Sequence, residues 1–189
     1  MDVSAVLDLF RTVGALHEGH FRLSSGLHSR GYLQSALVLQ HPPHAETLGR
    51  GLAEALRDLR PTVVLSPALG GLIIGHEVAR ALGVRAIFAE RQDGTLTLRR
   101  GFSLSPIERV VVIEDVVTTG LSTRETMACA TAAGAVVVGA GAIIDRSGGK
   151  ADLAVPFRSL ATYVVPNYEP TMCPMCEAGE PVTKPGSRT

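Results

Sequence analysis

Short runs of apolar, largely β-branched residues recur along this 189-residue chain, and stretches with helical spacing separate them. The runs lie at 62–66, 84–89, 109–113 and within 135–144. Strands that are apolar throughout are buried on both faces, and strands that alternate with helices form parallel sheets. We therefore expect an α/β fold with a central parallel sheet flanked by helices. Ligands of such sheets bind at the carboxyl ends of the strands.

The regions around these runs complete the expected organisation. Apolar residues at helical spacing predict helices at 4–16, at 44–59, from the loop 67–71 to about 82, and at about 122–133. Residues 19–34 mix Gly, Ser and His with apolar residues, which predicts short strands and turns. The polar, proline-rich tail at 166–189 is expected to be irregular. The length fits one domain, 1–189.

Composition excludes several classes of protein. Hydrophobic residues make up 46%, charged residues 19%, and the formal net charge is zero, so no general basic field for nucleic acid or anionic membrane is expected. No apolar run is long enough to span a membrane, and residues 1–16 do not resemble a signal peptide. Three cysteines are too few for a disulfide framework. We expect a cytoplasmic protein.

Two acids and a loop of small residues follow the run at 109–113. Glu114 and Asp115 come directly after Ile113, and Thr118-Thr119-Gly120-Leu121-Ser122 opens the next helix. Such a loop presents free backbone N–H groups, hydroxyls and the positive end of a helix dipole, which suits a phosphate monoester. An isolated acid pair would more simply solvate the sheet edge. Beside a phosphate site, two carboxylates suit a ribose 5-phosphate.

The stretch VVVIEDVVTTGLS at 110–122 resembles the phosphoribosyl-pyrophosphate (PRPP) motif of the type I phosphoribosyltransferases. The resemblance implies that family's sheet with a small N-terminal hood, at about 19–40 here. It implies that Glu114 and Asp115 hold the ribose hydroxyls and that the loop amides hold the 5-phosphate. The PRPP-binding residues it implies are Glu114, Asp115, Val116, Val117, Thr118, Thr119, Gly120, Leu121 and Ser122, with Ala68, Leu69, Gly70 and Gly71.

Three further stretches resemble the orotate phosphoribosyltransferases. GHFRLSSGLHS at 19–29 resembles their hood, AIIDR at 142–146 resembles their strand ending in Asp-Arg, and 173–188 resembles the tail of a shorter bacterial subgroup. The resemblance implies that Thr118, Arg146 and Tyr32 bind orotate. Physical chemistry agrees for Arg146, because a guanidinium can grip a carboxylate through two charge-assisted hydrogen bonds. The simpler alternative is a surface salt bridge with Asp145.

Residues 90–101 (ERQDGTLTLRRG) form a polar, glycine-containing segment between two expected strands. Such a segment beside an active site is a candidate lid, whereas the alternation at 95–98 favours an exposed hairpin. The resemblance implies a lid that closes over the diphosphate of a neighbouring subunit, and hence a homodimer. It makes Arg91 and Arg100 catalytic, together with Glu114 and Asp115, by stabilising charge on the leaving group.

The resemblance implies transfer of ribose 5-phosphate from PRPP to orotate, giving orotidine 5′-phosphate and pyrophosphate in de novo UMP synthesis. Mg²⁺ is implied as cofactor, held by ligand and water oxygens with no protein ligand. A purine phosphoribosyltransferase and a PRPP-sensing regulator of the same fold are the alternatives; a regulator would show an added DNA-binding segment or a basic face. At Ser24, Leu33, Leu69 and Gly70 the chain lacks residues that family members use, so we expect the backbone amides of 68–71 to bind the diphosphate.

The tail holds Cys173-Pro174-Met175-Cys176, which has the spacing of half a zinc site. One such pair is a weak signal, so we expect both cysteines to pack structurally and leave their role open. Cys129 lies in a helical pattern typical of a core. His17, His20 and His28 show no metal-ligand spacing.

Overall fold

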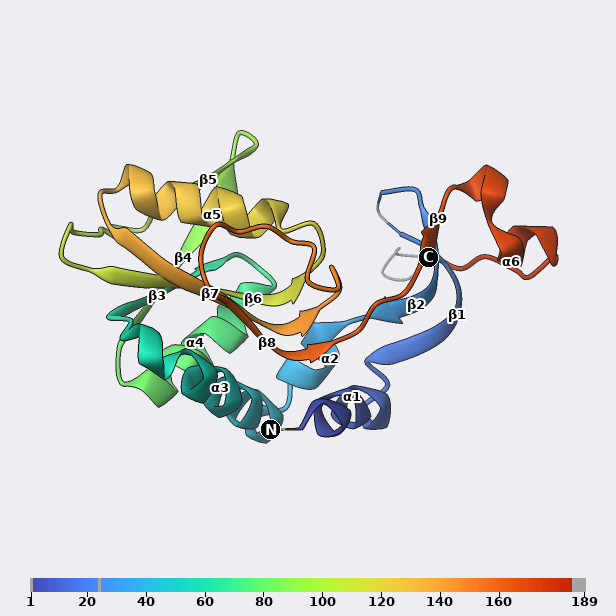
Figure 1. Cartoon of the computed structure of the whole chain (residues 1–189), viewed down its shortest axis with the longest axis horizontal. Coiled ribbons are helices and arrows are strands. Elements are labelled where there is room, and N and C mark those ends of the chain that lie inside the picture. The colour runs from blue at the N-terminus through green and yellow to red at the C-terminus, as the bar shows by residue number, and fades with distance from the viewer. Residues whose placement is uncertain (1, 24, 185–189) are drawn as a thin grey trace.

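The computed structural model describes residues 2–23 and 25–184, which form two sheets (Figure 1). The body holds a six-stranded sheet of order β5-β4-β3-β6-β7-β8, and a three-stranded sheet of order β1-β2-β9 projects from one end of it. The elements in chain order are α1 (Val3–Thr12), β1 (Leu16–Arg22), β2 (His28–Leu33), α2 (Ser35–Leu39), α3 (Pro42–Leu56), η1 (Arg57–Leu59), β3 (Val63–Pro67), α4 (Gly71–Leu82), β4 (Arg85–Gln92), β5 (Thr95–Leu98), β6 (Arg109–Val117), α5 (Leu121–Ala132), β7 (Val136–Asp145), β8 (Phe157–Thr162), β9 (Asn167–Tyr168), η2 (Pro170–Met172) and α6 (Pro174–Glu177).

The body sheet confirms the expected α/β class. Strands β4, β3, β6, β7 and β8 are parallel, and only the edge strand β5 runs antiparallel, as a hairpin with β4. The alternation at 95–98 therefore marks a hairpin strand. Strand β8 was not expected, because its sequence FRSLAT lacks the continuous apolar run of the inner strands. It lies at the open edge of the sheet, where only one neighbour covers it.

Helices cover both faces of the body sheet, with α5 on one side and α3 and α4 on the other (Figure 1). Strand β6 shows how the two cores separate. Val111 and Ile113 pack in the cluster that includes the buried residues of α3 and α4, whereas Val110 and Val112 pack with Ala130 of α5. All five side chains are fully buried. Because side chains alternate along a strand, Glu114 and Asp115, which follow Ile113 on β6, are expected to point to opposite faces of the sheet.

Three element boundaries differ from expectation for identifiable reasons. Strand β6 runs on to Val117 rather than ending at Ile113, because its ladder with β7 continues through this stretch. Helix α1 ends at Thr12, since Gly14 takes a positive φ of 66° and starts the turn into β1. Helix α3 begins at Pro42 and gives way to the 3-10 turn 57–59. Proline suits the first turn of a helix, where its missing N–H has no partner to lose.

The projecting sheet is built from the N-terminal hairpin and the tail. Strands β1 and β2 are antiparallel, and β9 pairs with the outer side of β2. The tail is therefore not irregular as expected: residues 167–177 hold β9, η2 and α6. We call β1, β2, β9 and α6 the hood unit. Among the elements of residues 2–23 and 25–184, no helix is both long and apolar enough to cross a membrane.

Candidate active site

Glu114 and Asp115 lie within β6, near its carboxyl end, and not after the strand. They therefore point to opposite faces of the sheet. Glu114 is buried on the α5 side, where Ser122 Oγ donates a hydrogen bond of 2.5 Å to its Oε1. Burial raises the pKa of Glu114 to about 7, although the Ser122 hydrogen bond opposes this shift. This carboxyl group changes charge near neutral pH.

Asp115 faces the loop between β3 and α4. A Cβ atom built on Gly70 would lie 2.7 Å from Asp115 Oδ1, so the loop can approach the carboxylate only because residue 70 is glycine. This contact explains why position 70 holds glycine and not the residue that other family members use, because a longer side chain here would displace Asp115. Burial raises the pKa of Asp115. Leu69 is 82% exposed next to it and can contact a ligand only from the rim.

The loop 118–120 forms the entrance to α5. Gly120 is the N-cap with φ 74°, and a Cβ there would lie 2.9 Å from the Leu153 side chain. The first turn of α5 carries no acid. A cavity of about 210 Å³ opens here, lined by residues 117–123 with Arg91 and Glu125. Backbone N–H groups of the helix N-terminus, hydroxyls and a cation beside one cavity make an anion site, although Leu121 N already donates to Thr119 Oγ1 at 3.3 Å. We call it the phosphate-loop cavity.

A second cavity, of about 350 Å³, lies between the body and the hood unit. It brings together Tyr32, Thr118 and Arg146, the three residues expected to bind the base. Its other lining residues are Arg22, Leu23, Ser25 and Lys184. Thr118 lines both cavities, so a ligand that fills them passes over this residue. We call this the base cavity.

Arg146 follows the end of β7 and is half-buried. Its Nε is buried and has no hydrogen-bond partner within residues 2–23 and 25–184. The salt bridge with Asp145 does not form, because Asp145 accepts hydrogen bonds from Ser147 (2.7 Å from N, 2.6 Å from Oγ) and from Gly149 N (3.0 Å). Burial lowers the pKa of Arg146. A half-buried guanidinium whose Nε has no partner is suited to an anionic ligand.

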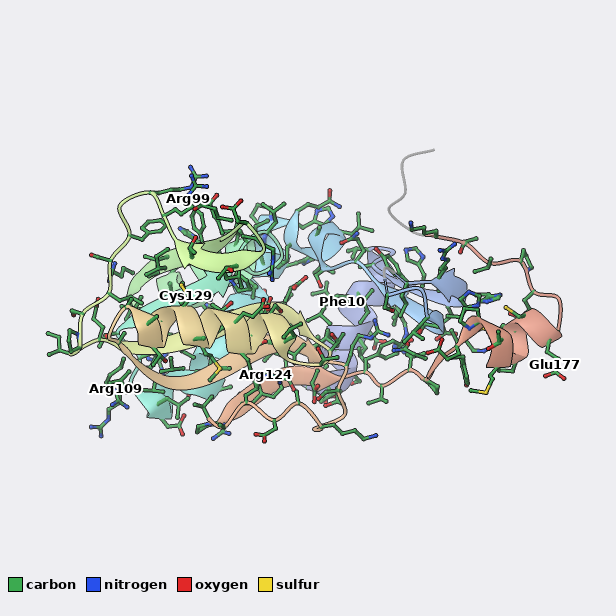
Figure 2. All side chains as sticks on the ribbon, turned by 90° about the horizontal axis from the view of Figure 1, so that it is seen from above. Phe10, Arg99, Arg109, Arg124, Cys129 and Glu177 are labelled. Carbon is green, nitrogen blue, oxygen red and sulfur yellow. The ribbon has the colours of Figure 1, made fainter. Side chains whose placement is uncertain are left out.

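The arginines of 90–101 divide into two groups. Arg91 lines the phosphate-loop cavity, where it pairs with Glu125 at 2.5 Å and donates to the Gly94 carbonyl. Arg100 instead pairs with Glu90 at 2.7 Å and lies 5.8 Å over the Phe88 ring. Arg99 points outward at the edge of the body (Figure 2). Of the two predicted catalytic arginines, the structure brings only Arg91 to the phosphate loop.

Sequence reasoning missed the contribution of the tail and one cluster. Lys184 lines the base cavity although it lies in the segment expected to be irregular. His20 and His28 converge with the two tail cysteines in a group that could hold a metal ion, although their sequence spacing did not indicate one. Their spacing is not that of a metal motif, and only the hairpin register brings them together. Ser24 and Arg188 lie outside the described residues.

Comparison with known proteins covers the whole chain. The phosphoribosyl transferase domain family matches residues 36–164. The orotate phosphoribosyltransferase of Heliobacterium modesticaldum is 54% identical over 191 residues and is covered completely by this chain, as this chain is by it. Among solved structures, orotate phosphoribosyltransferase of Mycobacterium tuberculosis in complex with Fe(III) dicitrate is 25% identical, with a TM-score of 0.74 over 86% of this chain and 96% of that one. The same enzyme in complex with PRPP is also 25% identical, with a TM-score of 0.68 over 86% and 96%.

Proposed function

This chain belongs to the orotate phosphoribosyltransferase family, and from that premise we infer the reaction and the residues that carry it. The chain transfers ribose 5-phosphate from PRPP to orotate and yields orotidine 5′-phosphate and pyrophosphate. The observation that carries the residue assignment is the shared lining of the two cavities. Thr118 belongs to both, so a sugar phosphate in one meets a base in the other at this residue.

We propose that Arg146 binds the orotate carboxylate. Its Nε is buried without a partner, and a guanidinium can place two parallel N–H groups on one carboxylate. Thr118 and Tyr32 line the same cavity and position the ring. Asp145 does not pair with Arg146, because its oxygens already accept hydrogen bonds from Ser147 and Gly149.

We propose that the phosphate-loop cavity holds the 5-phosphate of PRPP. The N–H groups at the start of α5 and the hydroxyls of Thr118 and Thr119 face a site with no acid in the first helical turn. Glu114 and Asp115 are the nearest carboxylates on β6, one on each face, and we assign them to the ribose hydroxyls. The phosphate-loop cavity would thus hold the 5-phosphate of the transferred sugar, and the two carboxylates would hold its ribose hydroxyls.

The transfer itself needs no protein nucleophile. The bond between orotate N1 and ribose C1 forms as the bond from C1 to the diphosphate oxygen breaks, and N1 releases its proton. Orientation of the two substrates and neutralisation of the departing charge then supply catalysis. Arg91 lines the cavity assigned to the 5-phosphate, and its action on the leaving group is proposed from the family resemblance.

Mg²⁺ is proposed as cofactor, and the residues at the site fit it. The residues that line the two cavities offer hydroxyls and one carboxylate, without a thiol or imidazole that would favour a softer metal. Glu114 and Asp115 would hold the ion indirectly, by orienting the ribose hydroxyls. When bound, Mg²⁺ neutralises charge on the diphosphate. Free thiols at all three cysteines suit a reducing compartment, and we propose the cytoplasm.

A homodimer with shared active sites is proposed from the arrangement of the β4–β5 hairpin. Arg99 points away from its own body (Figure 2). Arg100 donates to both carboxylate oxygens of Glu90 and lines neither cavity. Cations so placed can act on the site of a second subunit.

Sedimentation analysis tests whether the chain is a dimer. Mixing Arg146→Ala chains with Arg100→Ala chains tests whether two subunits share an active site. Recovery of activity on mixing is expected, and no recovery would contradict shared sites.

The assay for the reaction follows the ultraviolet absorbance of orotate in the presence of PRPP and Mg²⁺. We expect orotate to be consumed and pyrophosphate to appear in equal amount. A panel with adenine, xanthine and uracil in place of orotate is the control for base choice. Turnover with a purine but not with orotate would sink the assignment, and release of pyrophosphate without any base would point to hydrolysis.

A further inference from the structure

Four side chains of the hood unit converge on one point away from both cavities. His20 and His28 come from the paired strands β1 and β2, and Cys173 and Cys176 come from the start of α6. One nitrogen or sulfur atom from each lies within 4.8 Å of the other three. We propose that these residues form a structural zinc site that joins the tail to the hood.

The distances fit a tetrahedral ion. His20 Nε2 lies 3.6 Å from Cys173 Sγ and 3.7 Å from Cys176 Sγ, and His28 Nδ1 lies 3.2 Å from Cys176 Sγ. Zinc bonds of about 2.1 Å to nitrogen and about 2.3 Å to sulfur place a nitrogen about 3.6 Å from a sulfur. The two ring nitrogens are 2.8 Å apart, and need about 3.4 Å around the ion. Small side-chain rotations supply that difference.

The surroundings prepare His20 as a ligand. Its Nδ1 lies 2.9 Å from the carbonyl oxygen of Glu180. A carbonyl can only accept, so Nδ1 carries the proton and Nε2 turns an unshared pair toward the cluster. This outer hydrogen bond to a ligating imidazole is typical of metal sites. Three of the four residues are buried, and Cys176 is exposed.

The donor set selects the metal. Two imidazoles and two thiols in tetrahedral arrangement favour Zn²⁺ over the hard cations, which prefer oxygen. Four protein ligands fill the coordination sphere, which is the pattern of a structural site rather than a catalytic one. The site is therefore distinct in chemistry and in place from the proposed Mg²⁺ site.

The hood unit needs such a cross-link because its interior is polar. Leu16, at the start of β1, is buried in the body core. Among the other residues of 16–23, 25–33 and 167–184, the buried side chains are those of His20, His28, Ser29, Cys173 and Met175. None of these belongs to the two hydrophobic clusters of the body. A unit of fewer than about 40 residues usually requires a disulfide, a metal or a partner to stay folded. A zinc ion would link β1 and β2 to the tail and so stabilise the folded hood unit.

The site also fixes one wall of the base cavity. Thr183 N donates to the His20 carbonyl, and Arg22 N donates to the Thr183 carbonyl, each at 2.8 Å. Arg22 and Lys184, next to these bonds, both line the base cavity. Metal bound at His20 therefore holds the hood wall in place while leaving the phosphate loop on the body untouched.

The first test is the metal content of the full chain, expressed without a histidine tag and with zinc in the medium. We expect about one zinc per chain. Cys176→Ser and His28→Ala should each weaken zinc binding by more than about 100-fold, since even outer-sphere changes cost about 10–100-fold. Cys129→Ser and His76→Ala, the same chemical changes outside the cluster, should keep the metal.

The second measurement does not depend on variants that fold. Wild-type chain stripped with a chelator and reloaded with Co²⁺ should show the visible absorption of tetrahedral cobalt with thiolate ligands. Absence of that spectrum together with absence of zinc would overturn the proposal. So would a Cys173–Cys176 disulfide by mass, or zinc that survives both ligand substitutions.

A kinetic readout connects the metal to the proposed function and rests on it. Removal of zinc with a chelator, followed by removal of the chelator and assay at saturating Mg²⁺, should raise the KM for orotate at least about tenfold and leave PRPP binding by the phosphate loop nearly unchanged. Equal weakening of orotate and PRPP binding would contradict the proposal that the metal fixes the hood wall of the base cavity. If zinc is found but the chain does not turn over orotate, the proposed function fails and the metal site stands.

Discussion

The body and the hood unit of this chain are stabilised in different ways. The body buries two layers of aliphatic side chains against a mostly parallel sheet, and none of them needs a partner of defined chemistry. Beside Met175, the hood unit buries two imidazoles, a hydroxyl and a thiol, and buried polar groups are stable only when they have hydrogen-bond or metal partners. The base cavity lies between the two units. Its walls therefore respond to different perturbations: the substitutions below change the body, and the ligand substitutions at the proposed zinc site change the hood unit.

The largest effect is expected in the body core. Leu52 of α3 is fully buried, so Leu52→Ala should lower the free energy of unfolding of the chain by about 2–5 kcal/mol. Urea unfolding followed by circular dichroism measures this. Leu121→Ala, whose side chain is 57% exposed, is the control and should change it by less than about 0.5 kcal/mol. Similar losses for both would show that aliphatic packing does not set the stability of the body.

The next effect concerns the base cavity. Arg146→Ala should lower kcat/KM for orotate roughly 100-fold, because a desolvated charge-assisted pair contributes about 3 kcal/mol. The KM for PRPP should change little, since Arg146 does not line the phosphate-loop cavity. Steady-state kinetics with each substrate varied in turn measures both. Equal losses for the two substrates would remove Arg146 from the base site.

A smaller effect separates the two arginines of the hairpin. Arg91→Ala should lower kcat roughly 10- to 100-fold, because the residue lines the phosphate-loop cavity. Its exposed ion pair with Glu125 contributes little to stability, so unfolding should shift by less than about 1 kcal/mol. Arg100→Ala removes the same charge outside the cavity of its own subunit, so its loss of kcat reports the proposed action on a second subunit. A larger loss for Arg100 would show that the hairpin acts mainly on the other subunit.

The smallest effect is a pH dependence of PRPP binding. Burial holds the pKa of Glu114 near 7, so the carboxylate gains its charge as pH rises through that value. Between about pH 6 and about pH 8, affinity for PRPP should rise by about tenfold, following the ionised fraction. Stability has the opposite sign. A raised pKa stabilises the fold below the ordinary value of 4.5, and this contribution is lost as pH rises through 7.

Glu114→Gln provides the control for that profile. The amide does not titrate, so the dependence should flatten although the ligand's own phosphates still change charge. Binding measured by calorimetry at fixed Mg²⁺ separates the two contributions. An unchanged profile in Glu114→Gln would assign the titration to another group.

The same contrast explains how far the sequence could predict the structure. Body strands are apolar along their length, and this local signal placed β3, β4, β6 and β7 to within a few residues. The continuation of β6 past Ile113 came from its ladder with β7, which no local pattern reports. Thr118 and Arg146 reached one cavity because both follow parallel strands at the same sheet edge.

The strands of the hood unit do not have the continuous apolar runs that identified the body strands. His20 and Cys173 are 153 positions apart; His20 sits in no ligand pattern, and the pair Cys173 and Cys176 has the spacing of only half a zinc site. Only the pairing of β1 with β2 and the return of the tail along them bring the four residues together. The role of Asp145 was hidden for a related reason. It bonds the backbone of the following turn, which depends on loop geometry rather than on residue type.

The bonds of Asp145 also give the base cavity a charge preference. Because that carboxylate is already satisfied by Ser147 and Gly149, the neighbouring guanidinium keeps its full positive charge in a partly desolvated position. An uncharged pyrimidine such as uracil would leave this charge uncompensated, whereas a ring bearing a carboxylate neutralises it. With Arg146 in its proposed role, uncharged bases would be disfavoured without any steric barrier, through an aspartate whose oxygens bond to Ser147 and Gly149.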